Sequence, residues 1–184
     1  LPAAGGGAHR GLGDDVMYSG TVSGALEGTM FGIPSVAVSQ EGEDTFRFEV
    51  GARYATRVAS EVLVHGLPPE TILNVNIPDV PLRGIKGVKV TCLSRRRFNN
   101  PIVEKVDPRG RKYYWIAGTR QSWSRQQDAD HEALARHMVS VTPIRLDTTH
   151  HTMLAHFKTW EGTLSRPLVA RTQVRRRSSR RPQS

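Results

Sequence analysis

The first clear hydrophobic pattern in the chain begins after Ser19. Its apolar residues recur at helical spacing, at Val22, Ala25, Leu26 and Met30. This spacing predicts a helix with Ser19 as its N-cap, and Gly32-Ile33-Pro34 should end it because proline cannot continue a helix. The apolar run Val36-Ala37-Val38 then predicts a short strand buried on both faces. With the turn-forming Gly13-Asp14-Asp15 in front, residues 13–39 are expected to fold as a loop, a helix and a strand.

A second amphipathic pattern predicts a longer helix that ends near Val64, with Asp44 or Thr45 as its cap. Its apolar face is expected to comprise Phe46, Val50, Tyr54, Val58 and Val62, together with Ala55, Ala59 and Leu63. His65-Gly66 should end this helix, because glycine readily adopts the backbone conformation of a C-terminal cap.

Shorter elements are expected farther along the chain. Residues 72–77 alternate between apolar and polar and predict a strand, which places Asn74 and Asn76 on one face. These asparagines either line a functional site or make hydrogen bonds at the strand end. Two more strands are expected at 88–93 and at 139–142, the latter ended by Pro143, and helices are expected at 130–138 and 149–163.

Residues 99–118 predict a β-hairpin. Two strands, 102–106 and 112–116, flank the turn Asp107-Pro108-Arg109-Gly110, whose proline and glycine suit a type I turn. The aromatic second strand would expose apolar surface, which predicts a subunit interface. The alternative is that Tyr113, Tyr114 or Trp115 stacks on nucleic-acid bases.

The turn Ser19-Gly20-Thr21 is the principal candidate for chemistry. The first turn of a helix presents unpaired backbone N–H groups and a partial positive charge, and this turn adds two hydroxyls and one residue without a side chain. Phosphate is the natural ligand for such a turn. The alternative is an ordinary capped helix that binds no ligand.

Composition favours one globular domain with a basic tail. The chain has 184 residues, a net charge of +9 and one cysteine, so no disulfide framework is possible. Six of the nine net positive charges come from arginines after residue 170, where the chain has no acidic residue. We expect residues 165–184 to be a disordered tail, which either is only solvated or binds polyanions non-specifically. No apolar run approaches the ~20 residues that span a bilayer, and a cytoplasmic location is expected.

The stretch DDVMYSGTVSGALEGTMFGIPSVAVS (14–39) resembles the SurE survival-protein family, which are metal-dependent nucleotidases. The likeness continues through ILNVNIPD (72–79), KGVKVTCLSRRRF (86–98), DPRGRKYYWIAG (107–118) and VSVTPI (139–144). The resemblance implies an α/β, three-layer Rossmann-like sheet, hydrolysis of nucleoside 5′- or 3′-monophosphates, and homo-oligomers formed through the hairpin. It also implies that Ser19, Gly20 and Thr21 bind the substrate phosphate.

The same resemblance implies a divalent cation, Mg²⁺ or Mn²⁺, whose ligands this chain lacks. In the family, paired aspartates and a serine from an N-terminal half hold the cation, and this chain has no counterpart of that half. Two asparagines of the family align with Gly7 and Gly11 of this chain. The asparagine that aligns with Gly7 is the family's fourth metal ligand. We therefore expect the C-terminal portion of a nucleotidase whose sheet lacks its first strands. We assign no catalytic or metal-binding residue within it.

These expectations divide the chain into a disordered N-terminus (1–12), a partial nucleotidase domain with a projecting hairpin (13–164) and the basic tail (165–184). The expected activity is that of a phosphomonoesterase, impaired by the absence of the metal-binding half. The alternative is a non-catalytic fragment that oligomerises or associates with nucleic acid.

Overall fold

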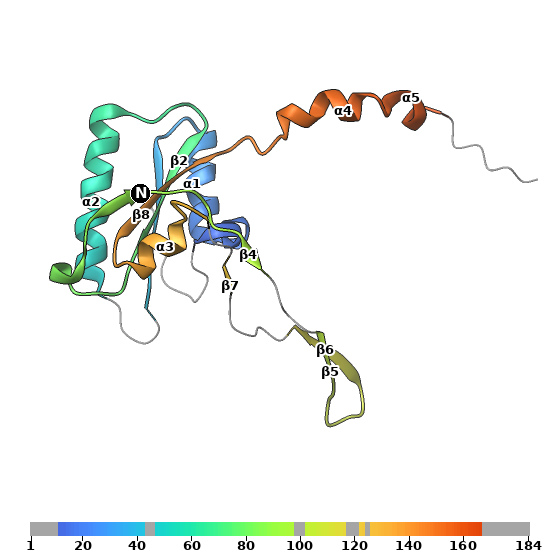
Figure 1. Cartoon of the computed structure of the whole chain (residues 1–184), viewed down its shortest axis with the longest axis horizontal. Coiled ribbons are helices and arrows are strands. Elements are labelled where there is room, and N and C mark those ends of the chain that lie inside the picture. Colours follow the sequence, from blue (N-terminus) through green and yellow to red (C-terminus); the bar gives the residue numbers. More distant parts are fainter. Residues whose placement is uncertain (1–10, 43–46, 98–101, 117–121, 124–125, 167–184) are drawn as a thin grey trace, which may run out of the picture. The chain divides into compact units, whose positions relative to one another are not determined.

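The computed structural model describes residues 11–42, 47–97, 102–116, 122–123 and 126–166. Two compact units, 1–147 and 148–184, make up the chain. The first unit contains a four-stranded sheet with the order β1-β2-β8-β3, comprising Ser35–Gln40, Thr71–Ile77, Val139–Arg145 and Val88–Val90 (Figure 1). β1 is parallel to β2, β8 is antiparallel to β2, and β3 is parallel to β8. The expected α/β class is confirmed.

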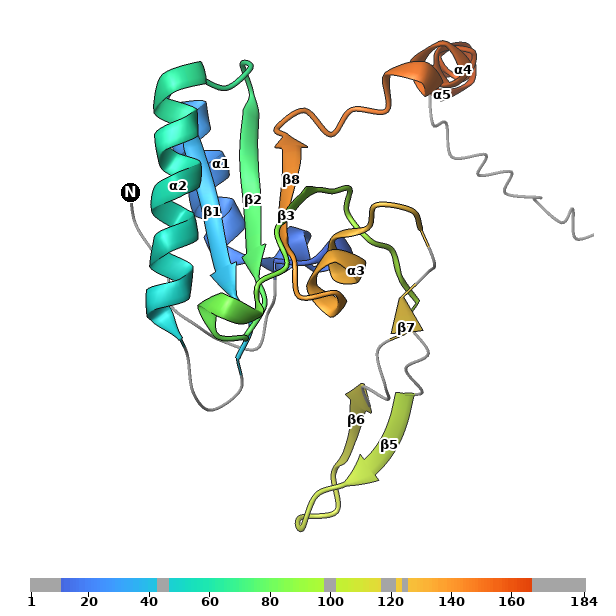
Figure 2. The same ribbon diagram turned by 60° about the vertical axis from the view of Figure 1, so that its left-hand side comes forward.

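Helices α1 (Gly20–Met30) and α2 (Phe48–His65) pack on opposite faces of this sheet. Figure 2 shows them on either side of β1. The core under α1 consists of Val16, Val22, Ala25, Ala37 and Ile72, and that under α2 of Val50, Val75, Ile77 and Val139. Alternation along β2 produces the two cores, because neighbouring residues of a strand point to opposite faces.

Helix α1 begins and ends where its sequence predicts. Ser19 Oγ accepts a hydrogen bond from Val22 N (3.3 Å), which confirms the N-cap. Gly32 follows the helix with φ +74°, and Ile33 N donates to Gly28 O (3.1 Å), a bonding pattern typical of helix C-termini. Met30, expected on the apolar face, is exposed instead.

The segment in front of α1 is more regular than the expected loop. It forms a 3₁₀ helix, η1 (Gly13–Tyr18), in which Asp15 N donates to Leu12 O (3.0 Å) and Ser19 N to Val16 O (3.2 Å). Gly13 starts it with φ +51°, a conformation that glycine adopts without strain. Val16 points inward and packs in the core under α1.

Helix α2 starts at Phe48 rather than near residue 45, and the expected caps Asp44 and Thr45 lie outside the described residues, as does Phe46. Val50 and Val62 are buried as expected. Leu63 is 86% exposed, which corrects its expected place on the apolar face. It lies one position beyond Val62, so about 100° of helical rotation turns it away from the sheet.

The strands differ from their expected lengths. β3 is three residues long and ends before Thr91, whereas β8 runs through Pro143 to Arg145. Pro143 pairs with Leu73 of β2, but β3 pairs with β8 only as far as Val141. One side of β8 is therefore unpaired at Pro143 within the described chain, and a residue without an N–H fits there. In β1, Ala37 is fully buried in the core under α1, and Val36 and Val38 are half-buried against the core under α2, so the strand is covered on both faces as expected.

The remaining elements of this unit are short. They are η2 (Leu82–Gly84), α3 (Asp130–Ala135), and the pair β4 (Arg96–Arg97) and β7 (Ser122–Trp123). α3 ends three residues before the expected boundary, and Ala133 and Leu134 are its buried apolar residues.

Strands β5 (Ile102–Val106) and β6 (Lys112–Ile116) form an antiparallel pair at the residues where the pattern predicts a hairpin. Asp107 organises the turn: its carboxylate accepts hydrogen bonds from Arg111 N (2.8 Å) and Arg109 N (2.9 Å). The bond from Arg111 N is the main reason why the pKa of Asp107 lies below its ordinary value.

The second unit was expected to contain one helix over 149–163. The described residues instead form three short pieces, η3 (His151–Met153), α4 (Leu154–Lys158) and α5 (Glu161–Leu164). Between α4 and α5, Thr159 N donates to His156 O (3.2 Å) and Trp160 N to Phe157 O (3.0 Å), and these three-residue bonds interrupt the α-helical pattern. Phe157 and Trp160 contact edge to face, with ring centroids 4.9 Å apart.

Two expectations concern the chain ends. Gly11 and Leu12 are buried in the first unit, so the expected disorder of residues 1–12 is wrong for these two residues. Residues 1–10 and 167–184 lie outside the described residues, and the expected disorder there stays a prediction. No described helix combines the length and the apolar character needed to cross a membrane.

Candidate functional site

The sheet face that carries α1 is polar in its centre. Alternation places Asn74 and Asn76 of β2 opposite Thr142 and Ser140 of β8, and all four are at most 2% exposed. Thr91 continues the row, with its hydroxyl 2.7 Å from both the Ser140 and the Thr142 hydroxyls. Buried polar groups need hydrogen-bond partners, so these side chains restrict how the segment packed against this face of the sheet can lie.

The two asparagines hold the segment that leads into η1. Asn74 Nδ2 and Asn76 Nδ2 both donate to Gly11 O, at 2.6 and 2.9 Å. This confirms that they share a face, and their amide groups bond to a loop carbonyl rather than to a strand end. A Cβ on Gly11 would lie 3.2 Å from Asn74 Oδ1 and 3.6 Å from Ser39 Oγ. Gly11 therefore lies beside the carboxyl ends of the parallel strands β1 and β2.

Gly13 is held by a different side chain. Its N–H donates to Oδ2 of Asp130 (2.7 Å), the first residue of α3. The other oxygen of Asp130 accepts hydrogen bonds from Ser94 N (3.1 Å), Ser94 Oγ and His131 N (2.8 Å). Asp130 and Ser94 are both fully buried. Thus Gly11 and Gly13, two residues apart, are fixed by different parts of the fold.

The predicted phosphate-binding turn forms the start of α1. Ser19 is 3% exposed and its oxygen caps the helix, whereas Gly20 is exposed and Thr21 is half-buried. A Cβ built on Gly20 would meet no atom within 4 Å, so open space lies on the side of Gly20 where a side chain would project. No hydrogen bond is found for Gly20 N or Thr21 N within the described chain, as expected for the first N–H groups of a helix.

The described residues do not assemble a metal centre. Within the described ranges, no three His, Cys, Asp or Glu side chains lie together as a candidate cation site. Asp14 is exposed and Asp15 half-buried, and both take part in other interactions. The donor set of the described residues therefore does not fit a divalent cation on its own.

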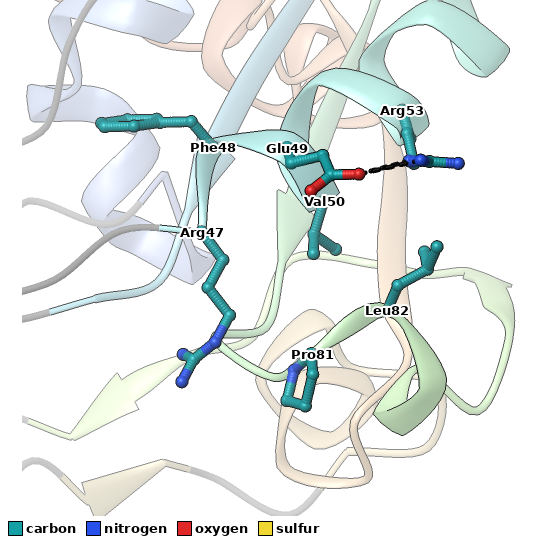
Figure 3. Close-up of a pocket in the computed structure, with 7 residues that line it drawn as sticks. All are labelled: Arg47, Phe48, Glu49, Val50, Arg53, Pro81 and Leu82. Carbon is teal, nitrogen blue, oxygen red and sulfur yellow. Dashed lines mark hydrogen bonds and ion pairs between the residues drawn. The ribbon is translucent and has the colours of Figure 1, made fainter.

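An open pocket of about 370 Å³ lies elsewhere, between the start of α2 and η2 (Figure 3). Arg47, Phe48 and Leu82 are among the residues that line it, and Glu49 pairs with Arg53 across 2.8 Å at its rim. None of the residues of the predicted phosphate-binding turn lines this pocket. Its charged groups already have partners, since Arg47 also pairs with Asp79.

Sequence patterns did not indicate Asp130 or Ser94. The only signals were an aspartate at the start of a predicted helix and a serine beside a basic run. The bond to Gly13 joins residues 117 positions apart, which no local pattern reveals.

An open α/β sheet with a helix N-terminus near the carboxyl ends of two parallel strands defines a class of protein that binds ligands at that edge. A family model described as "Survival protein SurE" matches residues 4–100, and the chain belongs to this family.

Sequence comparison with individual proteins supports membership in this family. The chain is 44% identical over 165 residues to the 5′-nucleotidase SurE of Geobacter sulfurreducens, covering 88% of this chain and 63% of the relative. It is 48% identical over 140 residues to the 5′-nucleotidase SurE of Moorella thermoacetica, covering 76% and 54%. The crystal structure of the SurE protein from Aquifex aeolicus matches with a TM-score of 0.75 and 39% identity, over 84% of this chain and 63% of that one. The chain thus spans less than two thirds of the length of each.

Proposed function

We propose that this chain carries the phosphate-binding part of a phosphomonoesterase that acts on nucleoside 5′- or 3′-monophosphates. Family membership supports the reaction class, and the relatives named above are 5′-nucleotidases. The structural observation that supports it is the exposed backbone of Gly20 at the start of α1, beside the carboxyl ends of β1 and β2. Anions bind at such a position because free N–H groups and the helix dipole both favour negative charge.

In this proposal the three residues of the turn have different tasks. Gly20 N–H and Thr21 N–H donate to phosphate oxygens, and the Thr21 hydroxyl adds a third donor. Ser19 holds the helix start in place through its bond to Val22 N. A divalent cation, when bound, would supply the activated water in such hydrolases. We expect low activity from this chain, because its described residues do not assemble a cation site.

Replacing Thr21 tests the proposed phosphate contact. We expect Thr21→Ala to lower the rate of p-nitrophenyl phosphate hydrolysis, measured with added Mg²⁺ or Mn²⁺, by at least about tenfold, within the range lost with one transition-state donor. Thr56→Ala, the same change on the exposed side of α2, should alter it less than about twofold. No hydrolysis by the wild type, or equal rates in both variants, would contradict the enzymatic proposal.

We also propose that the hairpin mediates self-association. Ile102, Val106 and Tyr114 share one face of the β5–β6 pair and are 59–70% exposed. Between them, Glu104 pairs with Lys112 (2.7 Å) on the same face. An exposed apolar patch with a satisfied ion pair at its side is typical of a surface that another protein covers. Polyanion binding by the basic tail concerns residues outside the described ranges and stays a prediction.

Introducing a positive charge on this face tests the second proposal. We expect Tyr114→Lys to weaken self-association at least about tenfold in sedimentation velocity, since a lysine must be desolvated at the interface. Tyr113→Lys, on the opposite face of β6, should weaken it much less. Equal effects of the two substitutions, or a wild type that stays monomeric at all concentrations, would contradict the role of this face.

A further inference from the structure

Asp130 divides its two carboxylate oxygens between local and distant partners. Oδ1 accepts hydrogen bonds from its neighbour His131 and from Ser94, whereas Oδ2 accepts only from Gly13 among the bonds found in the described chain. A carboxylate that only stabilised the start of α3 would not need this second contact. All its partners in these bonds are donors, so both carboxylate oxygens act as acceptors. One oxygen of a completely buried acid is thus committed to a backbone N–H in the loop before η1.

The contact with Gly13 fixes the orientation of the chain that leads to α1. From Gly13 the main chain continues directly into η1, which Leu12 O and Val16 O close by accepting from Asp15 N and Ser19 N. Each of these bonds spans only three residues, so Gly13 and the N-cap Ser19 can move little relative to each other.

Side-chain packing adds a second restraint to the same path. Val16 of η1 packs against Val22 and Ala25 of α1, in the core under that helix. On the other side of Gly13, the carbonyl of Gly11 is held by the amides of Asn74 and Asn76. A displacement of Gly13 would therefore be passed to the first turn of α1 rather than absorbed in the loop.

We propose that Asp130 is a positioning residue for the phosphate-binding turn. Acting through Gly13, it sets where the N–H groups of Gly20 and Thr21 point at the carboxyl edge of the sheet. This inference rests on the proposed phosphate-binding role of that turn. Preorganised donors bind an anion more tightly because they need not be reoriented when it arrives.

The test compares Asp130→Asn with Ser35→Ala in the full chain. An asparagine keeps one acceptor oxygen but presents an NH₂ group to one of its donor partners, so Asp130→Asn cannot keep all the bonds. Ser35 is also buried and its hydroxyl bonds to Ile33 O (2.8 Å), but it lies at the amino end of β1. It therefore controls for the loss of a buried hydrogen bond away from the turn.

Inorganic phosphate is the probe, and binding is followed by the amide NMR shifts of Gly20 and Thr21. We expect Asp130→Asn to weaken phosphate binding at least fivefold and to speed hydrogen exchange at Ser19 N at least fivefold. Ser35→Ala should change both less than twofold. If the folded Asp130→Asn variant matches Ser35→Ala in both quantities, the positioning role is overturned while the proposed function stands. If wild-type Gly20 and Thr21 do not respond to phosphate, the proposed function fails, and exchange at Ser19 N still decides whether Asp130 orders the turn.

A measurement on the wild type covers the case in which Asp130→Asn does not fold. If positioning and binding are coupled, the coupling is reciprocal, so bound phosphate must strengthen the bond between Gly13 and Asp130. Saturating phosphate should then slow hydrogen exchange at Gly13 N at least fivefold, with no comparable change at Gly66 N, which bonds to Val62 O at the far end of α2. Unchanged exchange at Gly13 N, with phosphate bound, would overturn the proposal.

Discussion

Gly13→Ala should destabilise the protein by about 3 kcal/mol or more. Gly13 has φ +51°, which costs a residue with a side chain about 1–3 kcal/mol. A Cβ there would also clash with Ser94 O, and would lie 2.7 Å from Ser94 Oγ and 2.8 Å from Trp123 Cζ3. Because Ser94 is fully buried and bonded to Asp130, it cannot move aside cheaply.

Chemical denaturation followed by circular dichroism measures this loss. Gly24→Ala is the matched control, since a Cβ there meets no atom within 4 Å and the residue lies within α1. Alanine is favoured over glycine inside a helix, so this control should gain up to about 1 kcal/mol. A loss below about 1 kcal/mol for Gly13→Ala would show that the loop is not held as described.

Ile72→Ala should cost about 2–5 kcal/mol, the range for truncating a large buried side chain. Ile72 is completely buried and packs with Val22 and Ala37 beneath α1. Its loss would leave a cavity between β2 and the helix that carries the predicted phosphate-binding turn. The neighbouring strands restrict collapse around the gap, which keeps the cost high.

The same denaturation experiment tests this substitution against Leu63→Ala. Leu63 is 86% exposed on α2, so its truncation should change the free energy of unfolding by no more than about 0.5 kcal/mol. Similar losses for the two variants would mean that the core under α1 is looser than its burial indicates.

Local sequence patterns predicted what local physics determines. The N-cap Ser19, the end of α1 and the alternation of β2 each depend on residues a few positions apart, and each is found. Family likeness suggested the reaction class that we propose and pointed to the turn of Ser19, Gly20 and Thr21. Whether that turn binds phosphate stays a prediction.

Features that depend on distant contacts could not be predicted in this way. Pro143 lies within β8 because β3 stops pairing two residues earlier, a fact set by the neighbouring strand. The roles of Asp130 and of the Asn74–Asn76 pair depend on a loop more than 60 residues away in sequence. Periodicity reports which face of an element is buried but not what lies against it.

Strand β1 forms one border of the sheet, bonded to β2 on one side only among the described residues. Its sequence, Ser35 to Gln40, contains neither a charged residue nor proline, the usual means by which proteins discourage edge pairing. Nothing in the sequence of this border therefore discourages main-chain hydrogen bonds with a further strand. An extended segment could thus add a strand beside β1 through backbone hydrogen bonds alone, which would widen the sheet on that side.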